Sequence, residues 1–235
     1  MMRYDTVLFD ADGTLLDFLR SEEEAVGQTL REMGCDPTAE MLAAYSAINQ
    51  SLWEQLERGE IEKNVLFYHR FALLFARYGI VADPHATAKR YMELLSQKGY
   101  LLAGAEALCR ALCGKVRLYI VTNGTEFIQR GRWACSGIAD CFCDMFISDV
   151  IGFEKPDRRY FDYVAAHVPD FCAERTLLVG DSLTSDIPGG IGYGIDTCFY
   201  DPKGKGLPPH LSERVRYAVG ELSQVYDIVM QGENA

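Results

Sequence analysis

The chain alternates short apolar runs with stretches whose apolar residues recur at helical spacing. Five apolar runs are predicted to be strands: residues 6–9, 117–122, 144–148, 175–181 and 196–200. Between two of them, Phe161, Val164 and Val168 recur every three or four residues, which is typical of a helix with one buried face. Strands that alternate with helices predict an α/β fold with a parallel, Rossmann-like sheet and right-handed crossovers.

A different pattern separates the first two predicted strands. Over residues 20–100 the apolar positions follow helical stripes, and no run alternates in the manner of a strand. Ser21 with Glu24 resembles a capping box, and Asp36-Pro37 and Asp83-Pro84 resemble helix starts with proline in the first turn. We therefore expect an α/β core over residues 1–16 and 100–235, interrupted by a domain of four helices at 17–99.

Composition and charge narrow the class of protein. Lys and Arg total 23 and Asp and Glu total 34 in 235 residues, which gives a formal net charge of −11. This balance argues against a nucleic-acid polymer or an anionic membrane as partner. Acids interrupt the N-terminal stretch before a secretory signal could form, and the eight cysteines include no C-x-x-C pair. A cytoplasmic protein with reduced thiols is the expectation.

Polar residues gather where the predicted strands end. Ligands of open parallel sheets bind beyond the carboxyl ends of the strands. The residues expected at that edge are Asp10, Asp12, Thr122, Asn123, Gly124, Asp181 and Asp186, with Lys155 nearby. Each of these signals alone is typical of an ordinary turn or a solvated edge, whereas their combination on successive strands indicates a functional site.

Four motifs resemble those of the haloacid dehalogenase-like superfamily of phosphatases. They are FDADGT at residue 9, IVTN at residue 120, the Lys155-Pro156 pair, and GDSLTSD at residue 180. The helical insert resembles the cap of that superfamily. Within it, AYSAINQSLWEQLERGEI and HRF resemble the pyrimidine 5′-nucleotidases, house-cleaning enzymes that act on noncanonical nucleotides.

The chemistry expected at this site is hydrolysis of a small-molecule phosphate monoester. Asp10, at the tip of the first strand, is the expected nucleophile and would form an aspartyl-phosphate. A carboxylate and a phosphate repel each other, so a divalent cation and Lys155 are expected to offset the charge. Mg²⁺ prefers oxygen ligands, and Asp10 and Asp181 fit that preference. The resemblance implies the backbone carbonyl of Asp12 as a further ligand and Asp186 as a support of the metal shell.

The remaining core residues have expected roles in proton transfer and phosphate binding. Asp12 would protonate the leaving oxygen and later take a proton from water. Thr122 would hydrogen-bond a phosphoryl oxygen, with the backbone N–H groups of Asn123 and Gly124 as further donors. By the resemblance, dehalogenases carry no acid at the position of Asp12, so its presence favours phosphoryl chemistry.

Substrate choice is less constrained by the sequence. Asn49 and Trp53 lie four residues apart and therefore share a helix face, where they are candidates to bind a base; the alternative is that both belong to an ordinary helical core. A 5′-nucleotidase is the first hypothesis for function. A phosphosugar phosphatase or phosphomutase of the same fold, and a catalytically silent binding protein, stay open as alternatives, as do monomer and homodimer.

Overall fold

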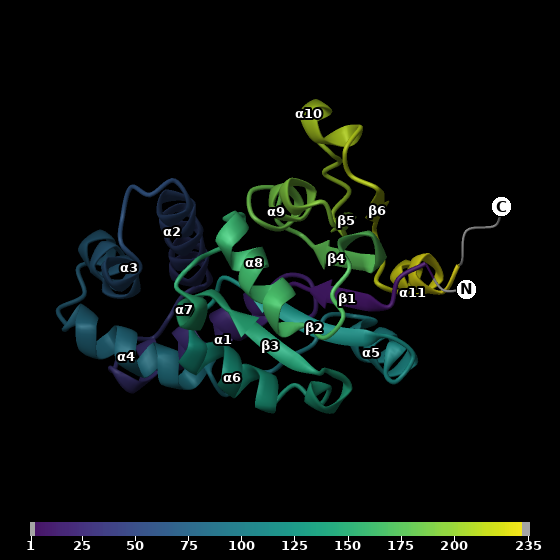
Figure 1. Cartoon of the computed structure of the whole chain (residues 1–235). Coiled ribbons are helices and arrows are strands. Elements are labelled where there is room, and N and C mark those ends of the chain that lie inside the picture. Colours follow the sequence, from purple (N-terminus) through teal and green to yellow (C-terminus); the bar gives the residue numbers. More distant parts are fainter. Residues whose placement is uncertain (1–2, 232–235) are drawn as a thin grey trace. The chain divides into compact units, whose positions relative to one another are not determined.

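The computed structural model describes residues 3–231, which form two compact units (Figure 1). Residues 3–17 and 99–231 make up an α/β unit, and residues 18–98 make up a helical unit. Within the described residues, every helix is too short or too polar to cross a membrane. The eight cysteines are free thiols, as the sequence suggested.

A six-stranded parallel sheet forms the centre of the α/β unit. Its strands are β1 (Thr6–Phe9), β2 (Arg117–Thr122), β3 (Asp144–Ile147), β4 (Thr176–Gly180), β5 (Asp196–Tyr200) and β6 (Tyr217–Val219). Their order across the sheet is β3-β2-β1-β4-β5-β6. The predicted fold class is confirmed, and the first five strands match the predicted runs to within one residue. β6 was not predicted, because its run of three apolar residues is too short to stand out as a strand.

Helices cover both faces of this sheet. They are α5 (Ala105–Leu112), α6 (Glu126–Ala134), α7 (Ser148–Ile151), α8 (Arg158–His167), α9 (Asp186–Tyr193), α10 (Pro209–Ser212) and α11 (Ser223–Met230). Side chains alternate between faces along a strand, so Val7 and Phe9 pack with α5 and α11, whereas Leu8 packs with α8. Burial on both faces explains why β1, β2 and β4 are almost entirely apolar.

Two glycines let α9 approach its neighbours closely. A Cβ on Gly189 would lie 2.6 Å from the ring of Phe161, and a Cβ on Gly190 would lie 2.5 Å from the side chain of Thr197. Neither position has room for a larger residue. The low helix propensity of these glycines is therefore offset by packing of α9 against α8 and β5.

The helical unit consists of four helices, as the sequence predicted. They are α1 (Phe18–Glu32), α2 (Ala39–Glu57), α3 (Lys63–Tyr78) and α4 (Pro84–Leu95). The rings of Tyr45, Phe71 and Tyr91 form the centre of its core, with centroids 5.1 to 5.6 Å apart.

Of the three helix starts predicted in this unit, one is correct and two are wrong. Asp83 caps α4, since its carboxylate accepts a hydrogen bond from the backbone N–H of His85 at 2.9 Å. Thr38, rather than Asp36, caps α2. Ser21 lies inside α1 and donates to the backbone carbonyl of Lys98, so the predicted capping box is wrong. A local motif cannot reveal that a helix begins one turn earlier.

Candidate active site

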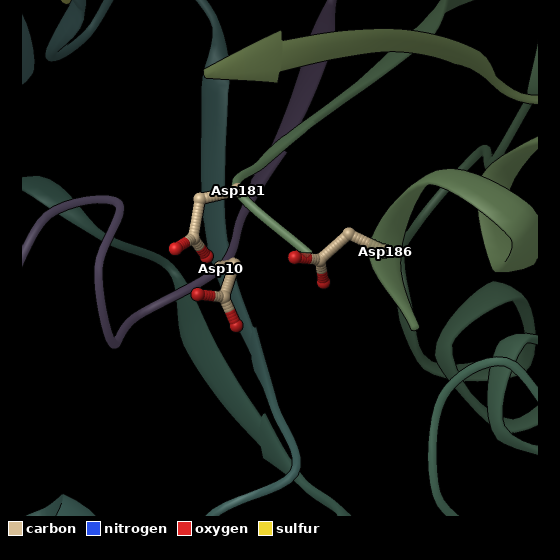
Figure 2. Close-up of side chains that lie close together, drawn as sticks. All are labelled: Asp10, Asp181 and Asp186. Atoms are coloured by element: carbon tan, nitrogen blue, oxygen red, sulfur yellow. The ribbon is translucent and has the colours of Figure 1, made fainter. Parts of the chain in front are cut away.

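Three carboxylates meet at the carboxyl edge of the sheet. β1 and β4 are paired in parallel with Phe9 opposite Val179, so Asp10 and Asp181 leave the two strands side by side. Asp186 is the first residue of α9. One oxygen from each of these three acids lies within 4.8 Å of the others, and Figure 2 shows the three carboxylates grouped together. Residues separated by up to 176 positions thus form one cluster.

Lys155 is buried among these acids. Its Nζ donates to Oδ1 of Asp10 at 2.8 Å, to Oδ1 of Asp186 at 2.6 Å and to the backbone carbonyl of Val121 at 2.7 Å. Burial disfavours the ammonium form, but the charges of Asp10 and Asp186 outweigh this effect and raise the pKa of Lys155. The side chain is therefore a fixed positive charge beside Asp10.

One ammonium group does not balance three carboxylates. Burial raises the pKa of Asp10 well above its usual range against the opposing effect of Lys155, and the charges of Asp186 and Asp181 add to the rise. The carboxyl group of Asp181 has an exposed edge, yet loss of surrounding water and the charge of Asp186 raise its pKa to about 7. An all-oxygen cluster with excess negative charge fits a hard divalent cation such as Mg²⁺.

A sharp turn after β1 makes room for Asp181. Gly13 has a φ of +88°, a left-handed conformation that L side chains rarely adopt, and a Cβ there would collide with the carboxylate of Asp181. The turn is closed by a hydrogen bond from the N–H of Gly13 to the carbonyl of Leu16 at 3.0 Å. Glycine is required at this position for both conformation and space.

The loop after β2 holds Lys155 in place through its backbone. The amide oxygen of Asn123 accepts from the N–H of Lys155 at 2.8 Å, and the amide nitrogen donates to the Lys155 carbonyl at 2.9 Å. The N–H of Gly124 donates to the hydroxyl oxygen of Thr122 at 3.1 Å. Only the backbone N–H of Asn123 was predicted to have a role, so this role of its side chain was not foreseen from the sequence.

Asp12 has two partners that were not predicted from the sequence. Its carboxylate accepts hydrogen bonds from Gln129 and Arg132, both on α6. The sequence offered only a weak indication of these contacts. Gln129 and Arg132 are two polar residues three apart in a helix that follows the Asn123-Gly124 turn. Spacing places them on one helix face but does not identify what that face meets.

Asn49 and Trp53 lie in α2 of the helical unit. Asn49 is buried; its amide nitrogen donates to Glu22 at 2.7 Å, and its amide oxygen accepts from Arg70 at 2.9 Å. Trp53 is partly exposed, with Nζ of Lys63 5.8 Å from its ring centroid. Contact of either residue with a substrate stays a prediction.

Comparisons with known proteins identify the family. Residues 4–194 match the family model described as haloacid dehalogenase-like hydrolase. The HAD-hydrolase YfnB of Bacillus subtilis is 39% identical over 230 residues, 97% of both chains. A crystal structure of YfnB bound to magnesium superposes with a TM-score of 0.91, covering 97% of this chain and 99% of that one.

Two further relatives carry names that describe an activity. The pyrimidine 5′-nucleotidase PynA of Streptococcus pneumoniae is 38% identical, over 96% of this chain and 95% of its own length. The pyrimidine 5′-nucleotidase YjjG of Escherichia coli is 30% identical, over 88% of this chain and 90% of its own. With its four motifs, its parallel sheet and its acid cluster, this chain therefore belongs to the haloacid dehalogenase-like hydrolase family.

Proposed function

We propose that this protein is a Mg²⁺-dependent phosphatase that hydrolyses nucleoside 5′-monophosphates, with pyrimidine nucleotides preferred. The observation that carries the proposal is the buried Lys155, which joins Asp10 to Asp186 at an edge where Asp181 adds a third carboxylate. The names of PynA and YjjG support the substrate class.

Asp10 is the nucleophile of the proposed reaction. Its carboxylate oxygen attacks phosphorus, the bond from phosphorus to the ester oxygen breaks, and an aspartyl-phosphate forms. Water then attacks this phosphorus and returns Asp10 to its free form, with release of inorganic phosphate. Lys155, 2.8 Å from Asp10, stabilises the charge that gathers on the phosphoryl oxygens in both steps.

The proposed metal site uses Asp10, Asp181 and the backbone carbonyl of Asp12, with Asp186 as support. When bound, Mg²⁺ would neutralise phosphate charge and so let an anionic nucleophile approach. The excess of carboxylates over ammonium groups at this edge supports the assignment.

Asp12 is the proposed general acid and base. It lies two residues after Asp10, beyond the end of β1, and its side chain is 29% exposed. In the first step it protonates the leaving ester oxygen, and in the second it removes a proton from the attacking water. The hydroxyl of Thr122 and the backbone N–H groups of Asn123 and Gly124 are the proposed donors to the phosphoryl group.

The helical unit is proposed to be the cap that selects the leaving group. Trp53 is the stronger candidate to contact a base, because its ring is partly exposed and can stack. Asn49 would have to give up a hydrogen bond to Glu22 or Arg70 to serve a substrate.

A phosphate-release screen tests the proposal. The panel contains pyrimidine and purine 5′-monophosphates and sugar phosphates, each assayed with Mg²⁺ and with a chelator. We expect Mg²⁺-dependent release from pyrimidine nucleotides, loss of activity in Asp10→Asn, and retention in Asp162→Asn, an exposed acid on α8 that serves as control.

Other outcomes would change the assignment. Release from sugar phosphates alone would replace the substrate class, and transfer of the phosphoryl group to a second hydroxyl would indicate a mutase. Absence of release from every ester in the panel would favour a binding protein and contradict the proposed function.

A further inference from the structure

Helix α6 directs two side chains at the carboxylate of Asp12. Gln129 and Arg132 are three residues apart and therefore share a helix face. Nε2 of Gln129 donates to Oδ2 of Asp12 at 2.5 Å, and Nη1 of Arg132 donates to Oδ1. Both oxygens of Asp12 are thus engaged, which fixes the plane of the carboxylate as well as its position.

The burial of these donors is unusual for a surface ion pair. Arg132 is fully buried and Gln129 is 1% exposed, whereas the side chain of Asp12 remains 29% exposed. A buried guanidinium is costly unless an anion accompanies it. The two donors therefore approach Asp12 from the protein interior and leave part of its carboxylate accessible from solvent.

The amide of Gln129 makes little use of its second polar atom. Within the described residues, its carbonyl oxygen is buried and has no hydrogen-bond partner. A buried unpaired oxygen lowers stability by about 1–3 kcal/mol. This arrangement lowers stability, so stability alone does not explain a glutamine at this position. Contact of its amide nitrogen with Asp12 does explain it.

Two glycines leave the space that α6 and its side chains occupy. A Cβ on Gly124 would collide with the amide of Gln129, so only glycine lets this side chain pass the loop and reach Asp12. A Cβ on Gly99 would collide with the backbone carbonyl of Arg132. The helix is therefore packed directly against neighbouring backbone at the level of Arg132.

We propose that Gln129 and Arg132 are positioning residues that hold the carboxylate of Asp12 in the orientation required for proton transfer. The inference rests on the proposed function, in which Asp12 protonates the leaving oxygen and activates water. Small displacements of a catalytic group lower rates by about 100-fold, and general acid–base catalysis contributes about 10²- to 10⁴-fold. Loss of the guanidinium is therefore expected to lower kcat by about 10- to 100-fold.

The test compares Arg132→Met with Arg130→Met. Arg130 lies on the same helix, but it is exposed and pairs with Glu126 at 2.8 Å, so it provides a matched control. Each variant is assayed with a pyrimidine 5′-monophosphate, whose leaving alkoxide needs a proton, and with p-nitrophenyl phosphate, whose leaving group does not. We expect Arg132→Met to lower kcat with the nucleotide. Its effect on kcat/KM, which reports formation of the aspartyl-phosphate, should be larger with the nucleotide than with p-nitrophenyl phosphate. Arg130→Met should behave as wild type.

A double-mutant cycle separates positioning from a general structural role. In an Asp12→Asn background, Arg132→Met should cost no further activity, because the group that Arg132 positions no longer transfers a proton. Gln129→Met should show the same pattern with a smaller loss, and Arg132→Lys should recover part of kcat. Should Arg132→Met fail to fold, Gln129→Met and Arg132→Lys decide the question in the same assays.

Equal loss of kcat/KM, which reports formation of the aspartyl-phosphate, with both substrates would overturn the positioning role, and so would full additivity with Asp12→Asn. So would variants that lower only thermal stability and keep kcat per folded molecule. These outcomes are distinct from failure of the proposed function, in which the wild-type protein itself would release no phosphate from any ester.

Discussion

Lys155 and Arg70 are both buried cations, but they have different surroundings. Lys155 lies at the sheet edge, where three carboxylates meet a single ammonium group. Arg70 lies in the core of the helical unit, where Asn49 links it to one buried acid, Glu22, and the ring centroid of Tyr91 lies 4.6 Å from its guanidinium carbon.

The difference lies in the balance of charge. In the helical unit the charges of Glu22 and Arg70 are equal and opposite, and an amide and aromatic rings fill the space between them. At the sheet edge the acids exceed the base, so the folded protein carries repulsion that only a bound cation or proton relieves. The unbalanced charge at the sheet edge therefore fits a site that binds a cation, whereas the balanced charge in the helical unit fits a structural role.

The largest expected effect follows from removal of Lys155. Lys155→Met should lower kcat by about 10³-fold or more, since a fixed charge beside the transferring phosphoryl group is lost. Lys115→Met, an exposed lysine of the same unit that donates to Tyr226, is the control. Phosphate-release kinetics measure the change. If Lys155→Met keeps the wild-type kcat, Lys155 has no catalytic role.

The corresponding change in the helical unit should act on stability. Arg70→Met removes hydrogen bonds from a buried charged group and should lower the free energy of unfolding by about 2 kcal/mol. The kcat of the folded fraction should change little. Urea unfolding and activity measured on the same samples test both parts, and a large loss of kcat at unchanged stability would contradict the comparison.

Addition of Mg²⁺ should affect only one of the two regions. At a concentration of 100 times Kd, a ligand specific for the folded state adds about 2.7 kcal/mol of stability. The thermal midpoint of the wild type should therefore rise with Mg²⁺, and this rise should be reduced in Asp181→Asn but retained in Arg70→Met. Differential scanning fluorimetry provides the measurement. An equal rise in Asp181→Asn would exclude Asp181 as a ligand.

The smallest effect concerns the pH dependence of the helical unit. Burial raises the pKa of Glu22, against opposing effects of Ser46, Arg70 and Asn49. A carboxyl group whose pKa is higher in the folded than in the unfolded state favours folding when protonated, so its contribution is lost as pH rises through the folded pKa. Glu22→Gln keeps an oxygen to accept from Asn49 and removes the titration. The decrease in thermal midpoint from about pH 5 to about pH 8 should therefore be smaller in this variant.

Local sequence patterns predicted most of the fold and the main residues that cluster at the sheet edge. Apolar runs located β1 to β5, helical patterns indicated four helices over residues 20–100, and the ends of the strands identified Asp10 and Asp181, with Lys155 nearby. These features depend on residue type and short-range periodicity, and parallel pairing then brings all strand ends to one edge. For this reason they can be inferred without coordinates.

Tertiary structure alone decided the partners of individual side chains. The contact of Arg132 with Asp12 joins residues 120 positions apart, and nothing in the spacing of either segment selects that pair. The amide of Asn49 was considered for substrate binding, yet it lies between Glu22 and Arg70. The sequence by itself determined which residues stand at the sheet edge, because strand periodicity is local. The folded structure decided which donor meets which acceptor, because long-range packing sets those distances.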